Sequence, residues 1–153
     1  MPKIDIANAE TKRGSGYPAP FDKPCADRLR KRLGDAGCLN DFGVNLLTLP
    51  PGVWSSQRHW HTGEDEFVYV LSGEVVLVDD HGEHVLRAGE CAAFPKGEKN
   101  GHHLINKSNA DAICLEVGTR SKTDFCDYPD IDMQIDSCDD KFIRRDGTPY
   151  PGQ

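Results

Sequence analysis

The sequence predicts an all-β fold, and three observations support this. From Phe42 onward, short apolar runs rich in β-branched and aromatic residues follow one another, which is the composition of strands. Turn residues separate the runs, and no helical pattern lies between them. Seven or eight strands at this spacing are typical of an antiparallel sandwich or barrel. The runs are FGVNLLTL, EFVYVL, EVVLVD, EHVLRA, CAAF, HHLIN and AICLEV.

The segments between the runs carry residues that supply a positive or a fixed φ angle. They are PPG at Pro50, SG at Ser72, DDHG at Asp79, AG at Ala88 and PKGEKNG at Pro95. The run EFVYVL is apolar at consecutive positions, so both of its faces should be covered. One face would line the barrel, and the other would meet a second sheet or a second subunit. We therefore expect a homodimer.

The composition along the chain divides it into three parts. Residues 1–40 are rich in Pro, Gly and charge, and they predict an N-terminal arm with a short helix at Cys25–Leu33. Residues 41–120 hold the strand pattern and predict one barrel, because no internal repeat is present. Residues 121–153 alternate acidic and isolated apolar residues. They predict a C-terminal tail whose one or two edge strands pack on the barrel or on a partner subunit.

The composition excludes several classes of protein. The chain has 153 residues, of which 37% are hydrophobic and 28% charged, and it holds no apolar run near the roughly 20 residues of a membrane span. The net charge of −7 disfavours nucleic acids, which require clustered Lys and Arg. A basic cluster is present at Arg28–Arg32, and it is short.

The cysteine content and the first residues both favour the cytoplasm. The start, MPKIDIANAETKRGSG, has no apolar core of the kind that a secretory signal needs. The six cysteines show no paired C-x-x-C spacing, and a chain of this size does not depend on a disulfide framework. We expect reduced, partly buried thiols.

Three histidines and one glutamate are candidate metal ligands. His59 and His61 are two residues apart in a predicted strand, so both rings point to one face with Cα atoms about 6.6 Å apart. Glu66 opens the next strand, and a hairpin would bring its carboxylate back beside them. His102 lies on a separate strand. Such a set suits iron, manganese, nickel, cobalt or zinc and leaves positions for water or substrate. The residues alone also fit surface histidines beside a solvated acidic turn.

Two segments together resemble the paired motifs of the cupin superfamily. Gly52, His59-Trp60-His61, Glu66 and Gly73 are similar to the first motif, with one extra residue before the first histidine. Gly89, Pro95-Lys96-Gly97, His102 and Asn106 are similar to the second, with a loop two residues longer than usual. Asn100 stands where the shorter loop would place the histidine. The intact His-x-x-x-Asn spacing favours His102, and His103 is the alternative.

More narrowly, several segments resemble a bacterial group of small single-domain cupins of the RmlC-like type. They are KRLGDAG, FGVNLLTLPPG, RHWHTGEDEFVYVLSGEV, NGHHLINKS and DGTPYP. Members are commonly described as cupin-domain proteins or loosely as relatives of sugar-phosphate isomerases. The resemblance implies a double-stranded β-helix (jelly-roll) barrel. It also implies one divalent metal ion, held by ring nitrogens of His59, His61 and His102 and by an oxygen of Glu66.

The resemblance leaves the reaction open, because one fold hosts many activities. One hypothesis is an enzyme that acts on a small, polar, oxygen-rich molecule by isomerase-like or lyase-like chemistry, or by dioxygenase chemistry if the metal is iron. The alternative is a non-catalytic module that binds or senses a small molecule. A purely structural role is disfavoured by the complete ligand set. Arg58, Lys96 and Lys99 flank the motifs, where they would attract an anionic substrate or simply be solvated.

Overall fold

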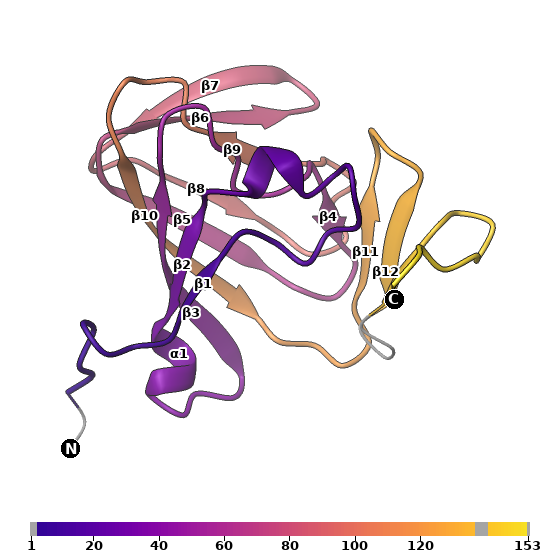
Figure 1. Cartoon of the computed structure of the whole chain (residues 1–153), viewed down its shortest axis with the longest axis horizontal. Helices are drawn as coiled ribbons and strands as arrows, with labels where there is room; N and C mark the ends of the chain where they lie inside the picture. Colours follow the sequence, from indigo (N-terminus) through magenta and orange to yellow (C-terminus); the bar gives the residue numbers. More distant parts are fainter. Residues whose placement is uncertain (1–2, 137–140, 153) are drawn as a thin grey trace.

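The computed structural model describes residues 3–136 and 141–152, and its strands form three sheets in which paired neighbours are antiparallel (Figure 1). The six-stranded sheet has the order β1-β2-β3-β10-β5-β8. Its strands are β1 (Thr11–Arg13), β2 (Leu29–Arg32), β3 (Phe42–Leu49), β10 (Ala112–Thr119), β5 (Glu66–Ser72) and β8 (Cys91–Phe94). The three-stranded sheet has the order β7 (Gly82–Arg87), β6 (Glu74–Asp79) and β9 (His103–Ile105). The prediction of an all-β fold is confirmed.

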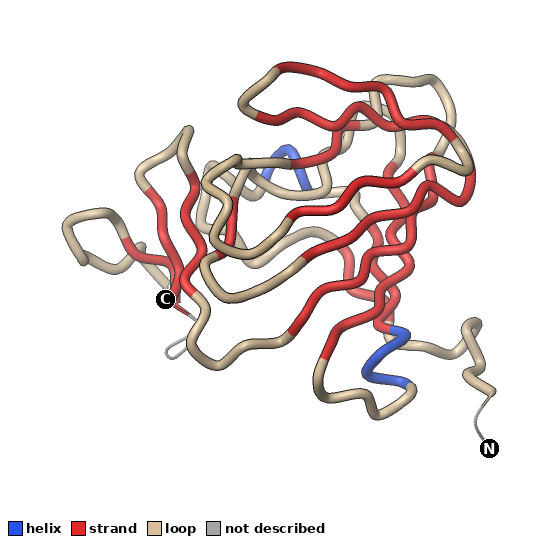
Figure 2. The backbone as a smooth tube through the Cα atoms, turned by 180° about the vertical axis from the view of Figure 1, so that it is seen from behind, coloured by secondary structure: helices blue, strands red, loops and turns tan. Residues whose placement is uncertain are grey.

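The main hydrophobic core is built from both of these sheets, whose strands wrap around it (Figures 1 and 2). It contains Leu47, Leu49, Val53, Val68, Val70, Val75, Leu77, Leu104, Ala112 and Cys114. The seven predicted runs all contribute strands, with bounds within a residue or two of the expected ones. Gly73, in the turn between β5 and β6, has φ of +77° and lies so close to Asp111 that a Cβ would approach its carbonyl oxygen at 2.8 Å. Glycine is therefore required there.

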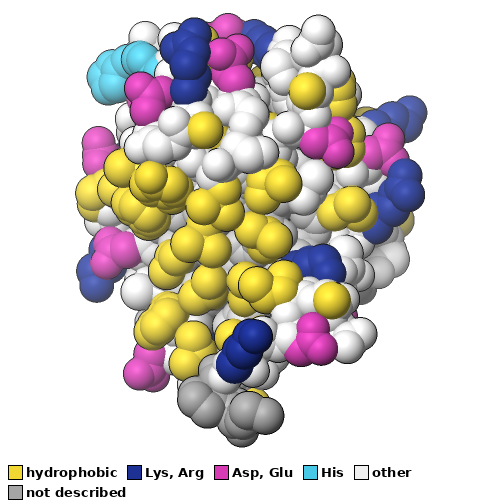
Figure 3. Space-filling model, turned by 90° about the vertical axis from the view of Figure 1, so that its left-hand side faces the viewer, with side chains coloured by type: hydrophobic (Ala, Val, Ile, Leu, Met, Phe, Trp, Pro, Cys, Tyr) yellow, Lys and Arg dark blue, Asp and Glu magenta, His cyan; other side chains and the backbone are white. Residues whose placement is uncertain are grey.

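Strand β5 is apolar on both faces, as its sequence predicted. Val68 and Val70 point into the core and are 3% and 0% exposed, whereas Phe67, Tyr69 and Leu71 are 37–47% exposed. The alternation follows from the two-residue period of a strand. Figure 3 shows a broad hydrophobic area on one side of the molecule. Phe67 of β5 and Phe42 are both exposed and line one shallow apolar hollow.

Residues before β3 extend the six-stranded sheet. Strand β2 pairs with β3, and β1 pairs with β2. The predicted helix at Cys25–Leu33 is wrong: a 3-10 turn spans Lys23–Cys25, β2 follows at Leu29–Arg32, and a single helical turn, α1, spans Leu33–Ala36. The edge of β3 offers free backbone groups, and pairing with that edge outweighs the weak helical preference of so short a segment.

The last part of the chain builds a small sheet of its own. β11 (Phe125–Tyr128), β12 (Met133–Asp136) and β13 (Lys141–Ile143) combine with β4 (Trp60–His61) in the order β13-β12-β11-β4. A second apolar cluster lies on it, centred on Cys126, Tyr128, Met133 and Tyr150. The tail therefore contributes three strands among the described residues, more than the one or two expected, and one of them pairs directly with β4.

Two further predictions concern membrane-spanning segments and the state of the cysteines. Among the described residues, no helix has the length and apolar character that a membrane crossing requires. Cys25, Cys114 and Cys126 are buried, Cys38 and Cys91 are exposed, and all five carry free thiols. Cys138 lies outside the described residues. The expectation of unpaired thiols is confirmed for these five.

Candidate metal centre

The four predicted ligands lie in three different parts of the fold, and backbone pairing holds each part. His59 and His102 form an antiparallel bridge, in which each backbone N–H donates to the carbonyl oxygen of the other residue, at 3.2 and 2.9 Å. His61 lies in β4, opposite Cys126 of β11. Glu66 begins β5. The expected hairpin between β4 and β5 is not formed, because the two strands belong to different sheets.

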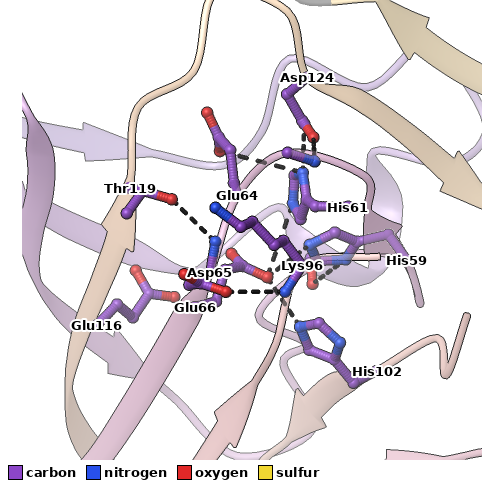
Figure 4. A network of polar contacts seen from close by, with 12 residues as sticks. His59, His61, Glu64, Asp65, Glu66, Lys96, His102, Glu116, Thr119 and Asp124 are labelled. Carbon is purple, nitrogen blue, oxygen red and sulfur yellow. Dashed lines mark hydrogen bonds and ion pairs between the residues drawn. The ribbon is translucent and has the colours of Figure 1, made fainter. Parts of the chain in front are cut away.

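The four side chains nevertheless converge (Figure 4). The Oε2 atom of Glu66 lies 2.9 Å from Nε2 of His102, 3.5 Å from Nε2 of His59 and 3.6 Å from Nε2 of His61. Three ring nitrogens therefore surround one carboxylate oxygen. Ligand atoms of His59, Glu66 and His102 all lie within 4.8 Å of one another, a spacing that can hold a metal ion.

The opposite ring nitrogens show which way two of the rings present their lone pairs. Nδ1 of His59 donates to the carbonyl oxygen of Gln57 at 2.8 Å, and Nδ1 of His61 donates to Oδ2 of Asp124 at 2.6 Å. A neutral imidazole has a single N–H, so both Nε2 atoms turn a lone pair toward Glu66. Lone pairs facing a carboxylate repel one another unless a cation lies among them. The donor set therefore fits a divalent metal ion.

The three histidines also affect the pKa of Glu66. Burial alone would raise the pKa of its carboxyl group, but the hydrogen bond from His102 and the other two histidines around it lower that pKa well below its usual range. A carboxylate that stays ionised in a partly buried place is suited to binding a cation.

Stacking also holds the ring of His102. It lies parallel to the ring of Phe94, with centroids 3.5 Å apart. Its Nδ1 atom is buried and has no hydrogen-bond partner in the structure. Its neighbour His103 points elsewhere: Nδ1 of His103 contacts the carbonyl oxygen of Ser56 at 2.9 Å, and its ring packs edge-on against Trp54. The geometry thus favours His102 over the alternative.

Comparisons with known proteins agree with this geometry. A family model described as the cupin domain matches residues 45–118. The crystal structure of a sugar phosphate isomerase of the cupin superfamily from Silicibacter pomeroyi is 47% identical, covers 99% of this chain and 98% of that one, and superposes with a TM-score of 0.92. The chain belongs to the cupin superfamily.

Other cupins are similar at lower identity. A candidate sugar phosphate isomerase from Acidithiobacillus ferrooxidans is 26% identical, with a TM-score of 0.78 over 95% of this chain and 90% of that one. An oxalate-binding protein from Thermotoga maritima is 37% identical over 71 residues, which are 46% of this chain. That match spans 56% of the length of the Thermotoga protein.

The candidate metal site of this cupin opens into a cavity of about 590 Å³. His59, Glu66 and His102 lie on its wall, together with Tyr128 and Glu116. The volume is within the usual range for a small-molecule site. The centre is therefore open to a ligand of modest size.

Asp124 is a candidate site residue that the sequence did not predict. Its side chain is 5% exposed, its Oδ2 accepts the hydrogen bond from His61, and its Oδ1 accepts one from the backbone N–H of Gly63 at 2.7 Å. A carboxylate in this place fixes the tautomer and direction of a ligating imidazole. No spacing rule links a tail residue to the first motif, so the sequence carries no signal for it.

Cys126, Tyr128 and Glu64 were also not predicted. His59, His61 and Cys126 form a second group of close donor atoms, and the ring of Tyr128 lies 5.7 Å from that of His59. Glu64 forms a third group with His61 and Asp124. Burial raises the pKa of Glu64, and a hydrogen bond from the Ser121 backbone opposes that rise.

The charged residues beside the motifs have structural partners. Arg58 bridges two acidic groups, donating to Asp80 and to both oxygens of Asp130, the latter at 2.8 and 2.7 Å. The ammonium group of Lys99 lies 5.7 Å from the centre of the Trp60 ring. Neither residue lines the cavity, so the alternative in which they attract a substrate is not supported by their placement.

Proposed function

We propose that this cupin is a metal-dependent enzyme for a small, polar, oxygen-rich molecule, with isomerase-like chemistry. The observation that carries the proposal is the convergence of three Nε2 atoms on one oxygen of Glu66 at the wall of the cavity. His59, His61, Glu66 and His102 would hold the ion. When bound, a divalent metal supplies a Lewis acid that polarises a carbonyl or hydroxyl oxygen of the substrate.

The protein's own residues would orient the substrate and move its proton. Glu116 lies on β10, next to β5, on the wall of the same cavity (Figure 4). Its Oε2 lies 2.7 Å from Nε of Arg30. This pairing holds the carboxylate in one position, where it can accept a proton from a substrate carbon. Similarity to the Silicibacter isomerase over nearly the whole chain supports this type of reaction.

A binding or sensing role is the second candidate, because the Thermotoga relative is an oxalate-binding protein. In that case the ion would order the site without turnover. Calorimetric titration with oxalate, together with NMR observation of aldose, ketose and hydroxy-acid probes, separates the two. Tight oxalate binding with no interconversion of any probe would favour the binding role.

Metal content tests the ligand set first. Protein purified without added metal should contain one divalent ion per chain by elemental analysis, and His59→Ala and Glu66→Gln should lose it. His81→Ala is the matched control, because His81 is exposed in the turn between β6 and β7. Full metal content in both site variants would show that the assignment is wrong.

A second copy of this chain would cover the outer face of β5. Phe67, Tyr69 and Leu71 are exposed there beside Phe42 (Figure 3), and apolar areas of this kind mark association sites. We expect a homodimer by light scattering, and Tyr69→Lys should shift it toward the monomer. Val85→Lys is the control on β7, outside this face. The free thiols of Cys25 and Cys114 agree with a cytoplasmic location.

A further inference from the structure

The basic cluster Arg28–Arg32 faces the same cavity as the metal centre. Arg28, Arg30 and Arg32 all line it. Arg30 and Arg32 are alternate residues of β2 and point to one side, and Arg28 directly precedes that strand. Tyr17 and Ser55 lie on the same part of the wall. The run that was too short to suggest nucleic acid thus supplies three guanidinium groups to one end of a small-molecule site.

Arg28 is a buried cation without a carboxylate partner among the described residues. It is 7% exposed, and it donates to two backbone carbonyl oxygens, that of Gly14 at 2.9 Å and that of Ser55. By contrast, Arg30 is held by two contacts to Glu116. Burial, and then the charge of Arg30, lower the pKa of Arg28. A guanidinium stays charged in proteins, so Arg28 places on the cavity wall a positive charge that forms no ion pair with a carboxylate in the described part of the chain.

The other charged groups of the lining have partners of opposite charge. The lining holds four guanidinium groups, those of Arg28, Arg30, Arg32 and Arg120, and four carboxylates, those of Asp35, Glu64, Glu66 and Glu116. Asp35 pairs with Arg32 and Arg120, and Glu116 pairs with Arg30, while Glu66 faces the three histidines. Arg28 is therefore the guanidinium of this lining that is left to pair with an anionic ligand.

The arginine end and the metal centre are close enough for one small molecule. Arg28 donates to the carbonyl oxygen of Ser55, and His59 is four residues further along the chain. Four extended residues span at most about 14 Å, and Arg28, His59, Glu66 and His102 all line the same cavity of about 590 Å³. A single molecule of modest length can therefore contact both the arginine and the candidate metal ligands.

We propose that Arg28, supported by Arg30, binds an anionic group, a phosphate or a carboxylate, of the substrate whose other oxygens face His59, Glu66 and His102. The guanidinium supplies parallel N–H donors that match the oxygens of either anion. This inference rests on the proposed function, since it names the substrate class of the same cavity. It adds that a neutral sugar is a poor ligand.

The test measures binding to the metal-free protein, so that its outcome does not depend on the metal centre. Titration calorimetry compares ribose with ribose 5-phosphate, and glucose with glucuronate. We expect at least one anionic probe to bind tenfold or more tightly than its neutral partner, and the preference to weaken as salt is added. The pair that shows it tells phosphate from carboxylate.

Variants assign the effect to Arg28. Arg28→Gln should abolish the preference, whereas Arg13→Gln, at an exposed arginine paired with Asp27, should keep it. Because Arg28→Gln can also disturb folding, Glu116→Gln provides a change in the opposite direction: it removes a negative charge beside Arg30 and should tighten the anion two- to tenfold. Equal binding of charged and neutral probes, or an unchanged preference in Arg28→Gln, would overturn the inference. An anion preference in a protein that never takes up metal would instead refute the proposed function alone.

Discussion

Replacing Asp124 by asparagine should weaken metal binding without changing any of the four ligands. The two carboxylate oxygens accept from two different N–H groups, Nδ1 of His61 at 2.6 Å and the backbone of Gly63 at 2.7 Å. An amide has one acceptor oxygen, so in Asp124→Asn one of these donors must face the NH2 group. Either His61 loses its orientation or the N–H of Gly63 is left without this acceptor.

The size of the effect follows from this loss. Removing the partner of a metal-ligating histidine typically lowers metal affinity by about 10- to 100-fold, which corresponds to roughly 1.4–2.7 kcal/mol. If the amide instead keeps its oxygen on His61, the unsatisfied N–H of Gly63 costs stability, on the order of 1–3 kcal/mol. The variant therefore loses metal affinity if His61 loses its acceptor, and loses stability if the N–H of Gly63 loses its acceptor.

Competition with a chromophoric chelator for zinc measures the affinity, and thermal unfolding of the metal-free protein measures the stability. Asp111→Asn is the matched control, because it makes the same charge change at an exposed position. Wild-type affinity and wild-type stability together in Asp124→Asn would refute the reasoning. So would an equal loss of affinity in the control.

Three further predictions concern stability. Gly73→Ala should unfold at much lower denaturant concentration than wild type, because its Cβ would lie 2.8 Å from a backbone oxygen. Gly97→Ala is the control: this glycine has φ of +80° with open space around it, so the change should lower the free energy of unfolding by only about 1–2 kcal/mol. Equal unfolding midpoints for the two variants would contradict this. Asn106→Ala should lower the free energy of unfolding by about 2–4 kcal/mol, because this fully buried side chain donates to two backbone carbonyl oxygens at 2.7 and 2.8 Å. A loss below about 1 kcal/mol in urea unfolding would argue against that role. Burial opposes ionisation of Asp127, but hydrogen bonds from Gln134 and Arg145 lower its pKa below the ordinary value. Its contribution to stability is therefore present above about pH 4 and is lost as the pH falls through the lowered pKa. Between pH 7 and pH 2, the free energy of unfolding should fall less steeply in Asp127→Asn than in wild type, and identical slopes would contradict the assignment.

Local patterns were enough to predict most of the barrel. The run EFVYVL shows why: its period of two places Val68 and Val70 in the core and leaves Phe67 and Tyr69 outside, whatever strands lie beside it. Strand geometry likewise placed His59 and His61 on one face, whereas the resemblance to the paired cupin motifs implied that Glu66 and His102 join them. The expected hairpin between the strand of His61 and the strand that begins at Glu66 was wrong, because β4 pairs with β11 whereas β5 pairs with β10.

The segment Cys25–Leu33 and residue Asp124 show where local patterns are insufficient. Alternating charged residues at Arg28–Arg32 carry little preference of their own, and the open edge of β3 decides that they form a strand. Asp124 reaches His61 only because β11 pairs with β4, across a sequence separation of 63 residues.

The sequence by itself determined the strands, the turns and the four candidate ligands, because each depends on the chemistry and spacing of neighbouring residues. The tertiary structure decided what surrounds those ligands: the orienting carboxylate of Asp124, the buried charge of Arg28, and the cavity on whose wall Arg28 and Glu66 both lie. These features come from residues far apart in the chain. Their proximity is set by how the sheets pack, and no spacing in the sequence records that packing.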